Sequence, residues 1–332
     1  MRGRRQGWHT RLVVLLAAST LVTQVAAARP TTTEAGRVAS PAARGADAAG
    51  PAAWPLPAEC TSPPANPGFA RLPATDAFST DLSDLGAGLK VRRLYAVAGD
   101  HLVPKDGLPV SRDCDVALWS VVQAATPKGL RRYLDELLLF DGADDSPDGE
   151  LLGEVQPALA DPTRWRLALR LDATDSNELL LTIAHEIGHL VTLNADETAP
   201  SFSDEECPTV VSAAGCMRPT ALLTRFISAQ WSRPLLEEWA NAAGIQADSA
   251  RRNALDAFYD KHAEQFVTPY AATSPQEDIA ESYAYWCLYG PDGDPNADVP
   301  GDGGPKLRYL DDQVQLRLDA GAGCTQLRRL LR

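Results

Sequence analysis

The chain has 332 residues, of which 45% are hydrophobic and 23% charged, and its formal net charge at pH 7 is −13. Composition of this kind is typical of a soluble globular protein, and the length allows a core that needs neither metal nor disulfides to form. The acidic balance argues against nucleic acid or an anionic membrane surface as a partner.

The first 28 residues have the three parts of a secretory signal peptide. Arg2, Arg4 and Arg5 precede an apolar run over 12–25, and three alanines at 26–28 resemble a cleavage site. The run is short for a transmembrane anchor and is interrupted by polar residues. We therefore expect cleavage, a secreted protein and no stable membrane association afterwards. Cleavage would remove four Arg and no acid, which changes the charge from −13 to −17.

Residues 29–68 are rich in Ala, Pro, Gly and Thr and show almost no apolar periodicity. This composition is typical of a flexible linker or a pro-segment. The folded domain is accordingly expected over 69–332, and we expect it to be a monomer.

Six cysteines follow the signal peptide, and an even number in an exported chain predicts three disulfides. Fifteen connectivities are possible in principle. Proximity along the chain favours the pairs Cys60–Cys114, Cys207–Cys216 and Cys287–Cys324. No CxxC pair occurs, which argues against a thiolate zinc site.

The first half of the domain shows mixed periodicity. A strand is predicted over 91–97, helices over 113–125 and 127–140, and an acidic loop over 141–149. Apolar residues then alternate with Arg164, Arg166 and Arg170, which predicts a half-buried strand over 164–171. If this is an edge strand, an extended peptide could add to it and the arginines would favour acidic substrates. Charges on an edge strand can equally serve to prevent aggregation.

The second half is predicted to be mainly helical. Asp175, with Glu178 three residues later, is a helix-start signature for a helix that runs to about Asn194. Further helices are predicted over 218–243, 249–266, 275–289 and 306–318. Residues 291–305 indicate a solvated acidic turn, because Ala297 occupies the position of the glycine in a calcium loop and no Glu closes the loop. The expected fold class is therefore α+β, with a small mixed sheet and a mainly helical C-terminal half.

The sequence His185-Glu186-Ile187-Gly188-His189 lies within the helix predicted from Asp175. Residues four apart share a helix face, so both His side chains can bind one Zn²⁺. Glu186 lies beside the first His, where it can act as general base toward a zinc-activated water. Gly188 permits close approach of another backbone.

A catalytic zinc site needs a third protein ligand and keeps one position open. The metzincin pattern would place Gly at 192 and His at 195, but the chain has Thr192 and Ala195, so that subclass is excluded. His101 and His262 are the other histidines of the predicted domain, and both are better interpreted as surface or helix-face residues.

A carboxylate from a later helix is the other solution. Ser274 and Pro275 predict a helix start, so Glu277 falls in the first turn and Glu281 shares its face. Either Glu can bind zinc while the other holds a ligand His through its second ring nitrogen. Glu277 could instead complete a capping box with Ser274. Weaker candidates are Glu237 and Glu238.

The two motifs resemble those of gluzincin metallopeptidases, of which thermolysin is the best-known member. Over residues 150–290, and most closely over Tyr270–Glu281, the chain is similar to the catalytic domain of anthrax lethal factor and its bacterial relatives. This resemblance implies a zincin-like fold, with Glu277 as the third metal ligand and Glu281 supporting a ligand His. It also implies that Tyr270 stabilises the oxyanion and that Glu186 is the base. The spacer between His189 and Glu277 is longer than in lethal factor.

These features predict a secreted zinc endopeptidase that acts on protein or peptide substrates. Two other functions fit part of the pattern. One is a zinc hydrolase of another bond, such as a cell-wall amide, and the other is a secreted binding protein with structural zinc. The presence of Glu186 argues against the binding protein, because a structural site needs no base.

Overall fold

The computed structural model describes residues 54–56, 60, 90–105, 113–141, 151–158, 161–172, 175–203, 206–292 and 304–331. The predicted signal peptide (1–28), most of the predicted linker (29–68), the loop over 142–149 and most of the acidic turn (293–303) lie outside the described residues. No helix in the described part has both the length and the apolar character needed to cross a membrane.

Five strands form a small mixed sheet in the order β2-β1-β3-β5-β4. Their bounds are β1 Lys90–Ala98, β2 His101–Pro104, β3 Leu134–Asp141, β4 Gly153–Pro157 and β5 Trp165–Arg170. β3 and β5 are parallel, and the other neighbouring pairs are antiparallel. The strand predicted over 91–97 is confirmed as β1, and β2 and β4 form the two edges of the sheet.

The helix predicted over 127–140 is wrong. A single 3-10 turn, Arg131–Tyr133, leads directly into strand β3. Leu137, Leu138, Leu139 and Phe140 are all fully buried, because β3 lies between β1 and β5 and is covered on both faces. A continuous apolar run is typical of such a strand, and its periodicity does not distinguish it from a buried helix.

The predicted half-buried edge strand is also corrected. β5 lies between β3 and β4, and all of its residues are buried. Arg166 donates to Oε2 of Glu136 at 2.8 and 2.9 Å, and Arg170 donates to Asp172 at 2.8 Å. Arg164, just before the strand, pairs with Asp135. The arginines are therefore engaged in ion pairs within the protein, and the substrate preference inferred from them is withdrawn.

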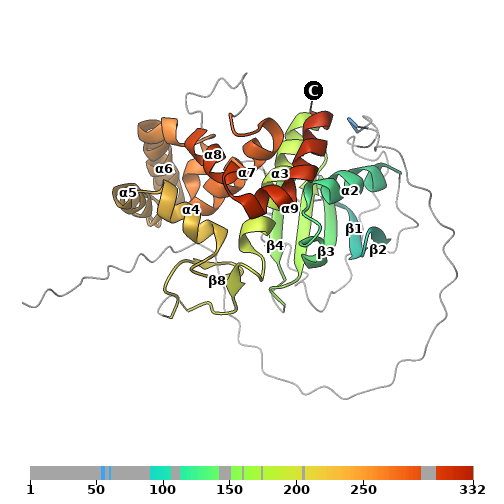
Figure 1. Cartoon of the computed structure of the whole chain (residues 1–332), viewed down its shortest axis with the longest axis horizontal. Coiled ribbons are helices and arrows are strands. Elements are labelled where there is room, and N and C mark those ends of the chain that lie inside the picture. Colours follow the sequence, from blue (N-terminus) through green and yellow to red (C-terminus); the bar gives the residue numbers. More distant parts are fainter. Residues whose placement is uncertain are drawn as a thin grey trace, which may run out of the picture.

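Three helices contribute, together with the sheet, to the main apolar core. They are α2 Asp113–Ala125, α3 Ser176–Leu193 and α9 Val314–Leu330. α2 contacts both α3 and α9, and Figure 1 shows where the three helices lie in the fold. A Cβ on Gly323 of α9 would lie 2.1 Å from the carbonyl oxygen of Ala124. Glycine therefore allows α9 and α2 to approach closely, and α9 extends twelve residues beyond the helix end predicted at 318.

The remaining helices gather on the other side of α3, as Figure 1 shows. The helix predicted over 218–243 is two helices, because Ser232 caps a new start and Pro234 occupies its first turn. The helix over 275–289 is confirmed as α7, and 306–318 spans parts of α8 and α9. The bounds are α4 Leu222–Gln230, α5 Arg233–Ala243, α6 Asp248–His262, α7 Pro275–Tyr289 and α8 Gly304–Asp311.

All three predicted disulfide pairs are present in the structure. Cys60 is bonded to Cys114, Cys207 to Cys216, and Cys287 to Cys324. A small sheet consists of β6 (Thr198–Ala199), β8 (Gly215–Met217) in the middle, and β7 (Val211–Ser212). The second disulfide links β8 to the loop between β6 and β7. The α+β architecture with a mainly helical C-terminal half is therefore confirmed.

Candidate metal centre

Helix α3 presents two imidazoles on one face. Asp175 caps the helix by accepting the backbone N–H groups of Asn177 and Glu178 at 2.8 and 2.9 Å, which satisfies donors that have no partner within the helix. One turn apart on the same face, His185 and His189 place their Nε2 atoms 3.1 Å from each other. The predicted pairing of the two imidazoles is therefore present in the folded chain.

Helix α7 supplies a carboxylate to the same point. The hydroxyl of Ser274 accepts the backbone N–H of Glu277 at 3.1 Å, and Pro275 occupies the first turn, as predicted. Oε2 of Glu277 lies 3.1 Å from Nε2 of both His185 and His189. This carboxylate therefore completes a three-residue cluster.

The alternative third ligands lie elsewhere. Glu281 contacts the opposite nitrogen of His185, with Oε1 2.6 Å from Nδ1. Glu237 pairs with Arg233, while Glu238 pairs with Lys261 and with His262. His101 lies on β2, in an edge strand of the sheet. Of these candidates, the structure brings only Glu277 to both Nε2 atoms.

The geometry of the three donor atoms fits a metal ion. They lie 3.1 Å from one another, and one ligand atom from each residue can be directed at a single ion. Tetrahedral ligands at roughly 2.0–2.1 Å from zinc are about 3.3 Å apart. A small shift of the side chains would therefore allow all three to contact one ion, and two nitrogens with one oxygen suit a borderline metal.

Close packing of α3 and α7 makes this arrangement possible. A Cβ on Gly188 would lie 3.1 Å from Cα and O of Ala280 and 3.2 Å from the ring of Tyr283. The predicted role of Gly188 in close backbone approach is therefore confirmed. The contacts His185–Glu281 and His189–Glu277 run in opposite chain directions, so the two helices are antiparallel.

The side chain of Glu186 extends from α3 toward the edge strand β4. It is 6% exposed, and a Cβ on Gly153 would lie 3.2 Å from its Cγ and Oε1. Burial raises the pKa of Glu186 above its ordinary value, although the two imidazoles and the backbone N–H of Val155 favour its charged form. No local sequence pattern indicates Gly153 and Val155, because only the pairing of β4 with β5 brings them to the motif.

Tyr270 begins the 3-10 helix η4 (Tyr270–Thr273), immediately before α7. Its ring centroid lies 5.7 Å from that of His185, and the residue is 52% exposed. The Glu277 carboxylate, followed by burial of the hydroxyl, raises the pKa of Tyr270 well above its ordinary value. The phenol therefore keeps its proton and can donate a hydrogen bond beside the cluster.

The neighbouring charges shift the pKa values of Glu277 and His185 in opposite directions. Burial opposes ionisation of Glu277, but the two imidazoles outweigh it and hold its pKa well below the ordinary value. Burial likewise disfavours the charged form of His185, yet Glu277 and Glu281 raise its pKa well above the ordinary value. Glu277 therefore stays a carboxylate, and the site stabilises positive charge beside it.

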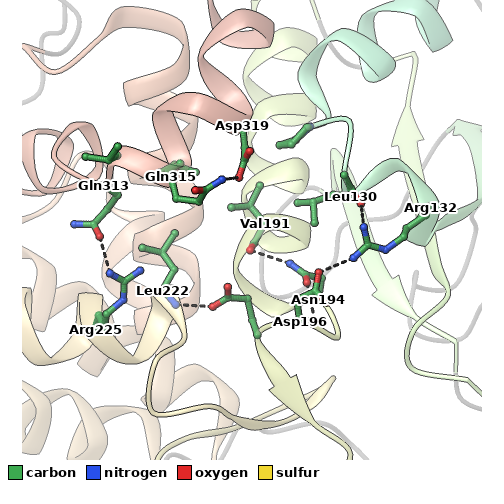
Figure 2. A pocket seen from close by; sticks show the side chains of 15 residues that line it. Leu130, Arg132, Val191, Asn194, Asp196, Leu222, Arg225, Gln313, Gln315 and Asp319 are labelled. Atoms are coloured by element: carbon green, nitrogen blue, oxygen red, sulfur yellow. Dashed lines mark hydrogen bonds and ion pairs between the residues drawn. The ribbon is translucent and has the colours of Figure 1, made fainter.

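A second feature, a pocket of about 370 Å³, lies at the C-terminal end of α3. Figure 2 shows Arg225, Leu222 and Asp196 on its lower side and Gln315 and Asp319 above. Val191 of its wall lies two residues after His189, roughly 200° around the helix. The pocket therefore opens on another side of α3 than the metal cluster.

Comparison of the chain with known protein families, curated proteins and solved structures found no match.

Proposed function

We propose that this protein is a secreted zinc-dependent endopeptidase with a zincin-like, gluzincin-type catalytic domain. The cluster of His185, His189 and Glu277 carries the proposal, because these three ligands leave one position open for chemistry. Glu186, on the same helix as two of them, adds a buried carboxylate that a structural metal site does not need. Three disulfides are consistent with export.

Zinc held by these residues would polarise the scissile carbonyl and make a water more acidic. The remaining work falls to the chain. Glu186 accepts the proton of the attacking water and delivers it to the leaving amine, a role that suits a carboxylate whose pKa is raised by burial. The protonated hydroxyl of Tyr270 donates to the carbonyl oxygen as negative charge develops on it.

The position of strand β4 favours a polypeptide as the substrate. It pairs with β5 on one side, and within the described residues no strand pairs with its other side. The backbone N–H of Val155 contacts Glu186, so the free edge of β4 runs past the proposed base. An extended peptide could add to this edge by main-chain hydrogen bonds, which replaces the earlier expectation for β5.

The test compares wild-type protein with Glu186→Gln on a diverse peptide library. The wild type should cleave peptides only when loaded with zinc, and the variant should lose about 10²–10⁴-fold in turnover while binding zinc equally well. Full activity of the variant would refute the general-base role. If the zinc-loaded wild type cleaves no peptide, it is not an endopeptidase, and a cell-wall amidase or a binding protein becomes the better interpretation.

A further inference from the structure

Thr268 lies in the short segment between the 3-10 helices η3 (Ala263–Gln265) and η4. Its hydroxyl donates to Oε2 of Glu281 at 2.6 Å. The same hydroxyl oxygen accepts the backbone N–H of Ala271 at 3.0 Å. One side chain therefore touches both the carboxylate behind the metal cluster and the turn that carries Tyr270.

The carboxylate of Glu281 is held at both of its oxygens. Oε2 accepts from Thr268, and Oε1 lies 2.6 Å from Nδ1 of His185. With Nδ1–H donating to Glu281, the lone pair of Nε2 in His185 is directed at the cluster. Because Glu281 is 7% exposed, loss of the hydroxyl would leave a largely buried oxygen without this hydrogen bond.

The other contact of Thr268 bears on Tyr270. Ala271 follows Tyr270 directly, so the hydrogen bond from its N–H fixes the start of η4 relative to Glu281. A second hydroxyl, that of Thr273, donates to the carbonyl oxygen of Tyr270 at 2.7 Å. Both threonines therefore brace the turn, but the hydrogen bond to Glu281 is made by Thr268.

We propose that Thr268 is a positioning residue that sets the orientation of His185, through Glu281, together with the position of the Tyr270 turn. This inference rests on the proposed function for its effect on turnover. Its effect on metal affinity does not depend on that function. A residue that only capped the turn would influence folding and Tyr270, and it would leave metal binding unchanged.

The experiment uses Thr268→Val, which keeps the shape of the side chain and removes the hydroxyl, and Thr268→Ser, which keeps the hydroxyl. Thr273→Val is the matched control, because it removes a hydroxyl from the same turn with no contact to Glu281. For each full-length protein, zinc affinity is measured by chelator competition. Thermal unfolding without metal and, on a cleaved peptide, kcat and KM are measured as well.

Thr268→Val should weaken zinc binding about 10–100-fold, as is typical for residues that support metal ligands. It should also lower kcat, with a smaller change in KM. Thr268→Ser should remain within about threefold of wild type, and Thr273→Val should keep wild-type zinc affinity. When Glu281→Ala is already present, adding Thr268→Val should weaken zinc binding by less than a further factor of about three, because both substitutions act through one contact.

Unchanged zinc affinity in Thr268→Val, or equal losses in Thr268→Val and Thr273→Val, would overturn the proposal. If Thr268→Val does not fold, the same comparison is made with Thr268→Ala, and the result is decided by whether Thr268→Ser restores zinc affinity. A wild type that binds zinc but cleaves no peptide would refute the proposed function alone. The loss of affinity and its rescue by Ser would still support the positioning role.

Discussion

A buried ion pair anchors the helix that carries Glu277, and its removal should be strongly destabilising. Nζ of Lys306 lies 2.6 Å from Oδ2 of Asp278, and the indole N–H of Trp231 donates to the same oxygen at 2.8 Å. The two charged residues are 3% and 0% exposed. Burial raises the pKa of Asp278 to about 6 and lowers that of Lys306, while each charge favours the ionised form of its partner.

The expected loss in the free energy of unfolding depends on Asp278, which remains buried when Lys306 is replaced. Lys306→Met replaces the ammonium with an apolar group of similar length. The buried Asp278 must then either stay charged with only the indole N–H as a donor or take up a proton at pH 7. Breaking a buried pair in this way costs about 3–5 kcal/mol, a large part of the roughly 5–15 kcal/mol of a typical domain. Adding Asp278→Asn should recover most of the loss, because the amide oxygen still accepts from Trp231 and no buried charge remains.

The assay is urea unfolding at pH 7 with the disulfides intact, analysed by linear extrapolation. Lys261→Met is the control, since Lys261 pairs with Glu238 at 2.7 Å on the surface, and an exposed pair contributes under about 1 kcal/mol. A loss below about 1 kcal/mol for Lys306→Met would refute the reasoning. So would a double variant as unstable as the single one.

Four further predictions concern the site and its surroundings. Glu277→Ala should weaken zinc binding by more than about 100-fold, and Glu281→Ala by about 10–100-fold, in chelator competition; the reverse order would exchange their roles. Tyr270→Phe should lower kcat about 10²–10³-fold with unchanged metal content, whereas wild-type kcat would exclude it from oxyanion stabilisation. Gly188→Ala should cost about 1–3 kcal/mol in urea unfolding, because the methyl meets backbone at 3.1 Å; a neutral effect would contradict the close approach. Burial raises the pKa of Glu197 above 4.5, so the folded state retains a proton that the unfolded state loses, and stability falls as pH rises through that window. Glu197→Gln removes this loss. In urea unfolding, the variant should therefore become more stable relative to the wild type as the pH rises from 4 to 7, and a stability difference that does not change with pH would contradict this.

Local sequence signals predicted the helices that begin at a clear N-cap and the elements whose apolar residues follow one clear period. Asp175 predicted the start of α3, and Ser274 with Pro275 predicted that of α7; both caps are made in the structure. The four-residue spacing of His185 and His189 was sufficient to place both imidazoles together, because a helix determines that relation locally.

The apolar pattern of β3 predicted the wrong element and that of β5 the wrong burial, because such patterns depend on which other elements cover a segment. The apolar run of β3 predicts a helix as readily as a strand, because β3 is apolar on both faces and its neighbours β1 and β5 come from other parts of the chain. Strand β5 alternates apolar residues with arginine, which normally indicates a solvent face. Its Arg166 is instead buried against Glu136, a partner that no local pattern identifies.

The sequence by itself determined two imidazoles, a carboxylate beside them and a pair of carboxylates one turn apart on a later helix. It could not decide between Glu277 and Glu281, because both share a helix face and either can reach a histidine. Only the antiparallel packing of α3 on α7, close enough because Gly188 has no side chain, decides this. That packing brings Glu277 to both Nε2 atoms and Glu281 to Nδ1 of His185.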